Sequence, residues 1–163
     1  MIHIEQATAA DVLEIKRVLK ETWVDTYLTL LSAETIEQIT AVWHAPERLS
    51  AEIENPHLYF ADAKEESGKI VGLITAVPLN DDVIVIARLY VLPTYQRQGI
   101  GGRLMEQAVH MFPQHTVLRL DVEAENEKGL AFYRQHGFLE IGRRQDEVSN
   151  EVLQVVEMEK RLK

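Results

Sequence analysis

Cysteine is missing from all 163 residues of the sequence. This absence excludes disulfide bonds, thiolate metal sites and a cysteine nucleophile, and it fits a reducing compartment. Six histidines are present, but their arrangement matches no metal-binding motif. We therefore expect a cytoplasmic protein that binds no metal.

Long apolar runs and positive charge are also scarce. No stretch reaches the roughly 20 apolar residues that cross a bilayer, and residues 1–11 lack the basic and apolar segments of a secretion signal. Lys and Arg number 17 against 26 Asp and Glu, so the formal net charge is −9 and repels phosphate backbones. We expect no membrane insertion, no export and no nucleic-acid partner.

Hydrophobic residues, in contrast, make up 46% of the chain, enough for the core of a single domain over residues 1–163. Apolar residues at helical spacing predict a first helix after the capping pair Thr8 and Asp11. Further helices are predicted over residues 33–42, 46–53 and 100–111. A last helix begins after Asn126 and ends at Gly137.

Apolar runs bounded by turn residues predict seven strands. The run over residues 83–91 is rich in valine and isoleucine and long enough to cross a sheet centrally. The others cover residues 2–6, 58–63, 70–77, 117–123, 138–142 and 152–158. This order of elements predicts an α+β domain built on one mixed sheet.

A glycine-bearing loop joins the strand over residues 83–91 to the following helix. Gly99, Gly101 and Gly102 lie where free backbone N–H groups and the helix dipole would bind a diphosphate. The same glycines would also permit a tight turn and close helix packing. No Gly-Lys-Ser/Thr sequence is present, so a Walker loop is excluded. A dinucleotide loop is disfavoured because seven residues separate Val91 from Gly99.

Two segments carry a specific pattern. Gln96, Gly99 and Gly101 follow the strand end Arg88, Leu89, Tyr90, Val91 and then Pro93, and the run from Asn126 to Phe138 contains Ala131, Tyr133 and Gly137. Together these segments resemble the two signatures of the GNAT superfamily of N-acetyltransferases, with a specific match over residues 83–138.

The resemblance implies a mixed, mostly antiparallel sheet of about seven strands, splayed at its central pair and flanked by about four helices. Residues 1–60 would form the substrate side, and residues 83–138 the acetyl-coenzyme A-binding core. Asn126 would contact the pantetheine unless it serves only as a helix cap. The implied cofactor-binding residues are Leu89, Tyr90, Val91, Gln96, Arg97, Gln98, Gly99, Ile100, Gly101, Gly102, Asn126 and Tyr133.

The implied activity is transfer of acetyl from acetyl-coenzyme A to a primary amine, either a small amine or polyamine or a protein N-terminus. Without a cysteine nucleophile we expect direct attack by the amine in a ternary complex. Tyr133 would return a proton to the departing thiolate, and the Val91 N–H would stabilise the oxyanion. Alternatively, the chain is a non-catalytic module that senses coenzyme A.

The general base is not assigned by the resemblance, because Ala87 stands where many relatives have a glutamate. Glu123, at the end of a strand, is our first candidate, unless it is a solvated carboxylate. The remaining candidates are Asp121, Asp82, Tyr27 and His44.

Residues 23–31 and 41–44 precede the cofactor-binding half and should determine substrate choice. Trp23, Tyr27 and Trp43 would form either an aromatic wall for the amine or part of the core. The strand over residues 152–158 is expected to be exposed and to support a homodimer.

Overall fold

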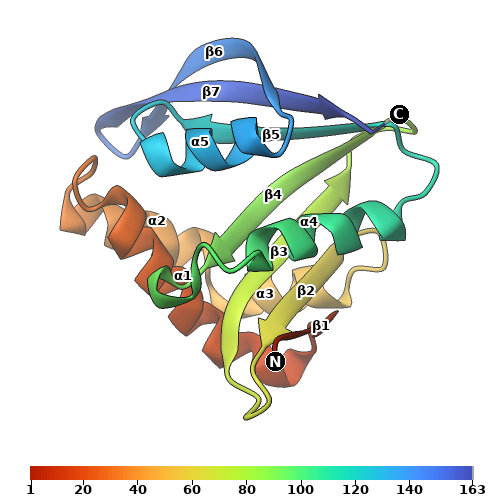
Figure 1. Ribbon diagram of the computed structural model, residues 1–163. Coiled ribbons are helices and arrows are strands. Elements are labelled where there is room, and N and C mark those ends of the chain that lie inside the picture. The colour runs from red at the N-terminus through yellow and green to blue at the C-terminus, as the bar shows by residue number, and fades with distance from the viewer. Residues whose placement is uncertain (163) are drawn as a thin grey trace.

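A seven-stranded sheet runs through the computed structural model, which describes residues 1–162 (Figure 1). Its spatial order is β1-β2-β3-β4-β5-β7-β6, and every neighbouring pair is antiparallel except β4 and β5. This arrangement confirms the predicted fold class. The strands are β1 (His3–Gln6), β2 (Tyr59–Lys64), β3 (Ile70–Pro78), β4 (Val83–Val91), β5 (Val117–Glu123), β6 (Leu139–Val148) and β7 (Glu151–Arg161).

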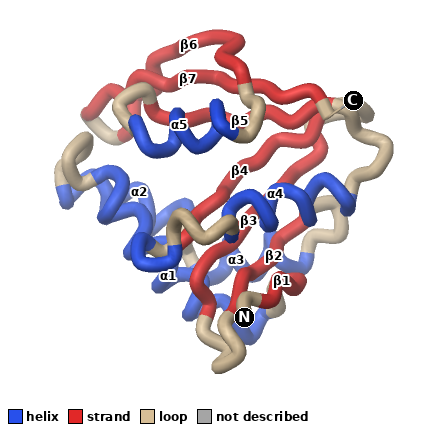
Figure 2. The backbone as a smooth tube through the Cα atoms, viewed as in Figure 1, coloured by secondary structure: helices blue, strands red, loops and turns tan. Residues whose placement is uncertain are grey.

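Helices cover both faces of the sheet, with α4 and α5 on one face and α1 and α3 on the other (Figures 1 and 2). The residue pattern predicts all five α-helices, one more than the resemblance implies, and Pro46 occupies the first turn of α3 and separates it from α2. They are α1 (Val12–Tyr27), α2 (Ala33–Trp43), α3 (Pro46–Glu54), α4 (Ile100–Met111) and α5 (Glu127–Gln135), with short 3-10 turns at Ala9–Asp11 and Pro93–Tyr95.

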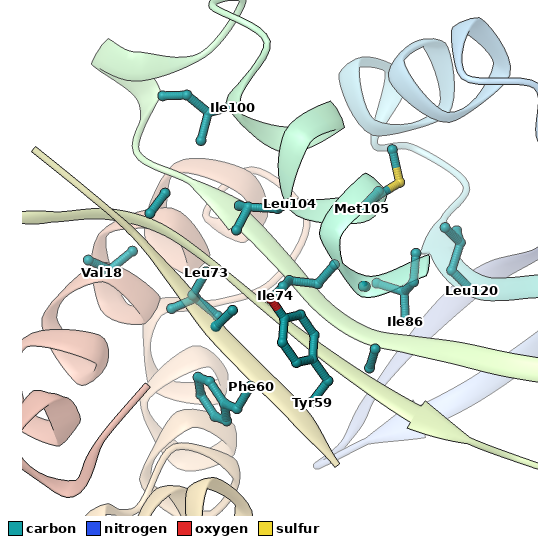
Figure 3. Close-up of a cluster of buried hydrophobic side chains, with 14 of the residues drawn as sticks. Val18, Tyr59, Phe60, Leu73, Ile74, Ile86, Ile100, Leu104, Met105 and Leu120 are labelled. Carbon is teal, nitrogen blue, oxygen red and sulfur yellow. The ribbon is translucent and has the colours of Figure 1, made fainter. Parts of the chain in front are cut away.

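The core fills both sides of β2, β3 and β4. Leu104 and Met105 of α4 pack over Ile74 on one side, while Val18 and Leu73 lie on the other (Figure 3). Burial of each such aliphatic side chain contributes about 1.5–3 kcal/mol. The central strands are therefore held firmly between the two helical layers.

Strands β4 and β5 pair only at their beginnings. The parallel ladder joins Val83 to Val117 and ends with Val85 opposite Arg119, although β4 continues to Val91 and β5 to Glu123. The strands therefore part over their second halves, as the resemblance implied. The separation begins three residues into each strand.

A β-bulge lies on β4 beside this separation. Thr75 pairs with Arg88 and the next residue of β3 pairs with Ile86, which leaves Ala87 as the extra residue. A bulge bends the strand and turns the side chains that follow it. The residues from Arg88 to Val91 are thereby redirected along the parted edge.

The C-terminal hairpin differs from the sequence prediction. The strand over residues 152–158 was expected at an exposed edge, but β7 lies between β5 and β6 and pairs with both. Strand β6 extends to Val148 rather than to Gly142 and covers the outer edge of β7. The second half of β6 is polar, so no apolar run marks it in the sequence. The argument for a homodimer through β7 is therefore wrong. No helix within residues 1–162 has the length and apolar character to cross a membrane.

Asp62 is buried in the middle of β2, and neither of its carboxylate oxygens has a hydrogen-bond partner within residues 1–162. Burial, reinforced by the nearby Asp11 and opposed by Lys64, raises the pKa of Asp62 to about 8. The folded state therefore retains a proton that the unfolded chain, with a carboxyl pKa of 3.8, releases. The contribution of Asp62 to stability is complete below pH 3.8 and is lost as the pH rises toward 8.

The Asp62→Asn variant should consequently gain stability relative to wild type as the pH rises from 4 to 8. The quantity compared is the difference in the free energy of unfolding between variant and wild type at each pH. The expected change in that difference is on the order of 3 kcal/mol, because the amide cannot ionise. Urea unfolding of both proteins at the two pH values measures it. An identical difference at both pH values would contradict a protonated Asp62.

Candidate active site

Four polar side chains converge where β4 and β5 part. Tyr90 comes from β4, Glu123 from the end of β5, Tyr133 from α5 and Tyr27 from the last turn of α1. Burial and then the proximity of Tyr90, Tyr133 and Glu123 raise the pKa of Tyr27 far above its ordinary value. The structure therefore brings together residues that are more than 100 positions apart in the sequence.

Tyr133 is the predicted proton donor, and its ring packs against Phe132 and Phe138 at centroid distances of 5.2 and 5.5 Å. Burial, with a smaller effect of the neighbouring Tyr90, raises the pKa of Tyr133 well above 10. The hydroxyl therefore stays protonated at neutral pH. A protonated phenol in this position can donate a hydrogen bond or a proton.

Glu123 is only 6% exposed, so it is not the solvated strand-end carboxylate that the sequence left open. One of its oxygens accepts a hydrogen bond from the backbone N–H of Glu125, which holds the carboxylate at the turn after β5. Its negative charge contributes to the raised pKa of Tyr27. A buried carboxylate near a phenol is suited to accept a proton or to bind a cation.

The other candidate bases lie in different surroundings. Asp121 is exposed and forms a 2.6 Å ion pair with Arg144, while Asp82 precedes β4 at the end where β4 and β5 are still paired. His44 is buried beside Trp23, with ring centroids 5.5 Å apart. Burial, followed by the charge of Arg88, lowers the pKa of His44 to about 3, so its imidazole is neutral.

The loop between β4 and α4 has the geometry of an anion site. Arg97 and Gly99 both have positive φ values, of 64° and 80°, which turn the chain sharply into the helix. The first hydrogen bond of α4 runs from the Arg103 N–H to the Gly99 carbonyl. The N–H groups of Ile100, Gly101 and Gly102 therefore have no partner within the helix and lie at its positive end.

The same glycines also serve helix packing, the second interpretation that the sequence left open. A Cβ atom on Gly101 would lie 2.9 Å from the Phe132 ring, and one on Gly102 would lie 3.0 Å from His136. Larger residues at these positions would separate α4 from α5. Helix packing and anion binding are compatible roles, because packing depends on the absence of a side chain whereas an anion would bind the backbone N–H groups.

Gln96 spans the loop, since its side-chain amide donates a 3.0 Å hydrogen bond to the Val91 carbonyl. The next residue, Leu92, donates its N–H to Val71 on the β3 side. Because successive peptide groups point to opposite sides of a strand, the N–H of Val91 faces the parted edge toward β5. The N–H of Leu89, another residue predicted to contact the cofactor, faces the same side because peptide groups alternate along a strand.

Asn126 caps α5, and its side-chain oxygen accepts a 3.0 Å hydrogen bond from the Gly129 N–H. The cap interpretation is therefore correct. Of the remaining predicted cofactor-binding residues, Gln98 is exposed in the loop, and the side chain of Ile100, the first residue of α4, is buried. Ile100 can contribute only its backbone to a ligand.

The aromatic residues of α1 and α2 form one cluster beside Tyr90. The Trp23 indole N–H donates a 3.1 Å hydrogen bond to the Tyr90 hydroxyl, and the Trp23 ring lies 4.4 Å from Tyr27 and 6.0 Å from Trp43. Trp23 is buried, whereas Trp43 is 43% exposed. Trp23 thus belongs to the core, and Tyr27 and Trp43 extend from it toward the surface.

Arg88 belongs to the first sequence signature, and in the structure it also joins α2 and α3 to β4. Its guanidinium binds both carboxylate oxygens of Glu52 at 2.8 and 3.0 Å and donates to the Trp43 carbonyl at 3.1 Å. The sequence did carry a signal of this role. A positive charge within an apolar strand requires a partner when it is buried. Within residues 1–162, no group of three His, Asp or Glu side chains gathers as a metal site would require.

Comparisons with known proteins support the same interpretation. The family model of the acetyltransferase (GNAT) family matches residues 14–138. A spermidine N(1)-acetyltransferase of Thermoplasma acidophilum is 29% identical, over 84% of this chain and 88% of that protein. The N-alpha-acetyltransferase RimI of Mycobacterium tuberculosis is 32% identical, over 61% of this chain and 63% of its own length.

A similar solved structure is that of the PaiA N-acetyltransferase from Thermoplasma acidophilum in complex with coenzyme A. It superimposes with a TM-score of 0.85 at 26% identity, and the match covers 99% of both chains. The likeness therefore extends over the whole described sheet.

The Arg88–Glu52 pair should be essential to stability. Glu52→Ala leaves the buried guanidinium without its carboxylate and should lower the free energy of unfolding by about 2–4 kcal/mol. Glu54→Ala, at an exposed position on the same helix, should change it by less than about 0.5 kcal/mol. Urea unfolding measures both values, and equal effects of the two substitutions would contradict this role of the pair.

Proposed function

The chain belongs to the acetyltransferase (GNAT) family and is an acyltransferase enzyme, and on this premise we propose that it transfers the acetyl group of acetyl-coenzyme A to the primary amine of a small cationic molecule. The observation that carries the proposal is the convergence of Glu123, Tyr133, Tyr27 and Tyr90 where β4 and β5 part. This site offers a carboxylate base and a protonated phenol beside a gap in the sheet.

The residues of the loop and the parted strand fit coenzyme A. The free N–H groups at the start of α4 suit its diphosphate, and the outward N–H of Val91 suits the pantetheine amides or the thioester oxygen. The side-chain amide of Asn126 has its nitrogen left for the pantetheine because the cap uses only the oxygen. Bound acetyl-coenzyme A supplies the activated acetyl group.

Glu123 accepts the proton that an alkylammonium, with a pKa of about 10.4, must lose before its nitrogen can attack. A nitrogen–carbon bond then forms and the carbon–sulfur bond breaks. The N–H of Val91 stabilises the negative charge that develops on the thioester oxygen. Tyr133 gives its proton to the departing thiolate and regains one from solvent or from the amine.

Two observations favour a small cationic acceptor. Tyr27 and Trp43 present aromatic rings around Trp23, and Tyr27 also feels the charge of the buried Glu123. Aromatic faces together with a carboxylate attract alkylammonium groups. In addition, the relative that matches 84% of the chain acts, by its name, on spermidine. A protein N-terminal amine is the competing acceptor class, and the relative named for that activity matches a smaller part of the chain.

The proposal is tested first with Tyr133→Phe. Calorimetric titration should give unchanged affinity for acetyl-coenzyme A, whereas thiol release with a panel of polyamines and small amines should fall about 10²- to 10³-fold in kcat, because the proton donor is lost. Tyr59→Phe, in the core away from the gap, should retain turnover.

Other outcomes have distinct meanings. Wild-type binding without thiol release from any amine, but with release from a peptide N-terminus, would replace the small acceptor by a protein. Binding without release from either class would favour the coenzyme A sensor that the alanine at position 87 suggests.

Glu123→Gln provides the second test. Loss of the base should lower kcat about 10²- to 10⁴-fold in the same assay, while Glu123→Asp should recover part of the rate. Glu125→Gln, an exposed neighbour two residues away, is the matched control and should leave the rate unchanged. Full activity of Glu123→Gln would show that Glu123 only stabilises the turn after β5.

A further inference from the structure

Strand β6 leaves one edge of the sheet open. It is the last strand in the spatial order, and among the strands of residues 1–162 it pairs only with β7 (Figure 1). The opposite edge is the short β1 of four residues, whereas β6 has ten, about twice the common strand length. A long open edge presents unpaired N–H and C=O groups to which another strand can add.

The backbone groups that face the open edge follow from the β6–β7 hairpin. A two-residue turn closes it, since Val148 pairs with Glu151. The residues of such a closing pair bond to each other, and successive residues of the strand then direct their backbone groups alternately toward and away from the neighbouring strand. The N–H and C=O groups of Arg143, Gln145 and Glu147 therefore face outward. A second strand must meet these three residues with outward groups of its own.

The charges of β6 are complementary to those of a second, antiparallel β6. In a symmetric pair the two-fold axis must pass through a residue, so that outward backbone groups meet outward groups. With the axis at Gln145, Arg143 lies opposite Glu147 of the second copy, and Arg144 lies opposite Asp146. Each of these pairs occurs twice because of the symmetry. Opposite charges directly across from each other stabilise two antiparallel strands.

The neighbouring registers are unfavourable. An axis at Arg144 would place that guanidinium against its own copy, and an axis at Arg143 would do the same. An axis at Asp146 would bring two carboxylates together, and like charges directly opposite each other are destabilising. Among these registers, the one centred on Gln145 is the register that pairs every charge of residues 143–147 with an opposite charge.

The charged side chains of this segment are accessible to a partner. Arg143 is exposed and contacts the exposed Glu140. Glu147 is also exposed and belongs to none of the ion pairs within residues 1–162, so the guanidinium of a second copy would supply its first one. Arg144 and Asp146 already pair at 2.9 Å, and a second copy would extend this pair into a network of four alternating charges.

We propose that two copies of this chain form a symmetric dimer by pairing their β6 strands antiparallel, with the two-fold axis at Gln145. The two sheets join into one continuous sheet, and the long open edge of each copy is covered. This interface differs from the one expected through residues 152–158, because β6 and not β7 is at the edge. It contains none of the proposed catalytic residues and does not depend on the proposed activity.

Sedimentation equilibrium of the full chain over a range of concentrations tests the dimer. Wild type should approach twice the mass of one chain as the concentration rises. Arg143→Glu and Glu147→Arg each place like charges opposite each other at two symmetric positions, and each should weaken the dimer about tenfold or more. Lys20→Glu, at an exposed position of α1, makes the same change in net charge as Arg143→Glu and should leave the dissociation constant unchanged.

An equimolar mixture of Arg143→Glu with Glu147→Arg tests the register. In a mixed dimer every substituted residue again lies opposite an opposite charge, so the mixture should associate with about the affinity of wild type. Circular dichroism confirms that each variant is folded. Folded variants that fail to associate when mixed would overturn the register centred on Gln145.

Gln145→Pro tests the backbone pairing without changing a charge. It removes an outward N–H at the axis and leaves the hydrogen bonds to β7 in place, so the folded variant should be monomeric. A dimer that survives this substitution would overturn strand pairing through β6. A wild type that stays monomeric at every concentration would overturn the interface as a whole, because the charges of β6 would then protect the edge from pairing.

Discussion

The parting of β4 from β5 is the constraint on which the rest of the structure depends. Strand β5 keeps a complete antiparallel ladder with β7, whereas its parallel ladder with β4 ends after Val85. Both strands remain stable because β4 pairs with β3 on its other side from Ile84 to Val91, apart from the bulge at Ala87. The separation therefore leaves the inner edges of two firmly held strands open, and Tyr90 and Glu123 are positioned there by strands that cannot easily close.

Burial gives the open edge its chemistry. Removal from water raises the pKa values of Tyr27 and Tyr133, and the charges of Tyr90, Tyr133 and Glu123 add to the shift of Tyr27. In the proposed mechanism this burial keeps Tyr133 protonated as the acid, while Glu123 is the base. Arg88 and Glu52 join α3 to the sheet, so a largely buried ion pair connects this helix to β4.

The glycines at the start of α4 show how packing and binding can share residues. Gly101 and Gly102 bring α5 close enough for Phe132 and His136 to touch α4, and their N–H groups remain at the free end of the helix. The same close approach brings His136 beside the loop and near Lys160. A net negative protein thereby carries basic side chains close together beside the start of α4, where the field of distant carboxylates is screened.

The sequence by itself determined the element order, the sheet class, the glycine loop and the positions of Gly137 and Asn126 at the ends of α5, since these features depend on local spacing and backbone preference. It indicated Tyr133 as a candidate proton donor and Glu123 as a candidate base, but it could not show that Glu123 is buried or that Asp121 pairs with Arg144. Only the tertiary structure decided that β7 lies inside the sheet, that Ala87 forms a bulge, and that Lys160 meets His136. Each of these depends on contacts between distant segments, which strand register and helix packing create and residue spacing alone does not encode.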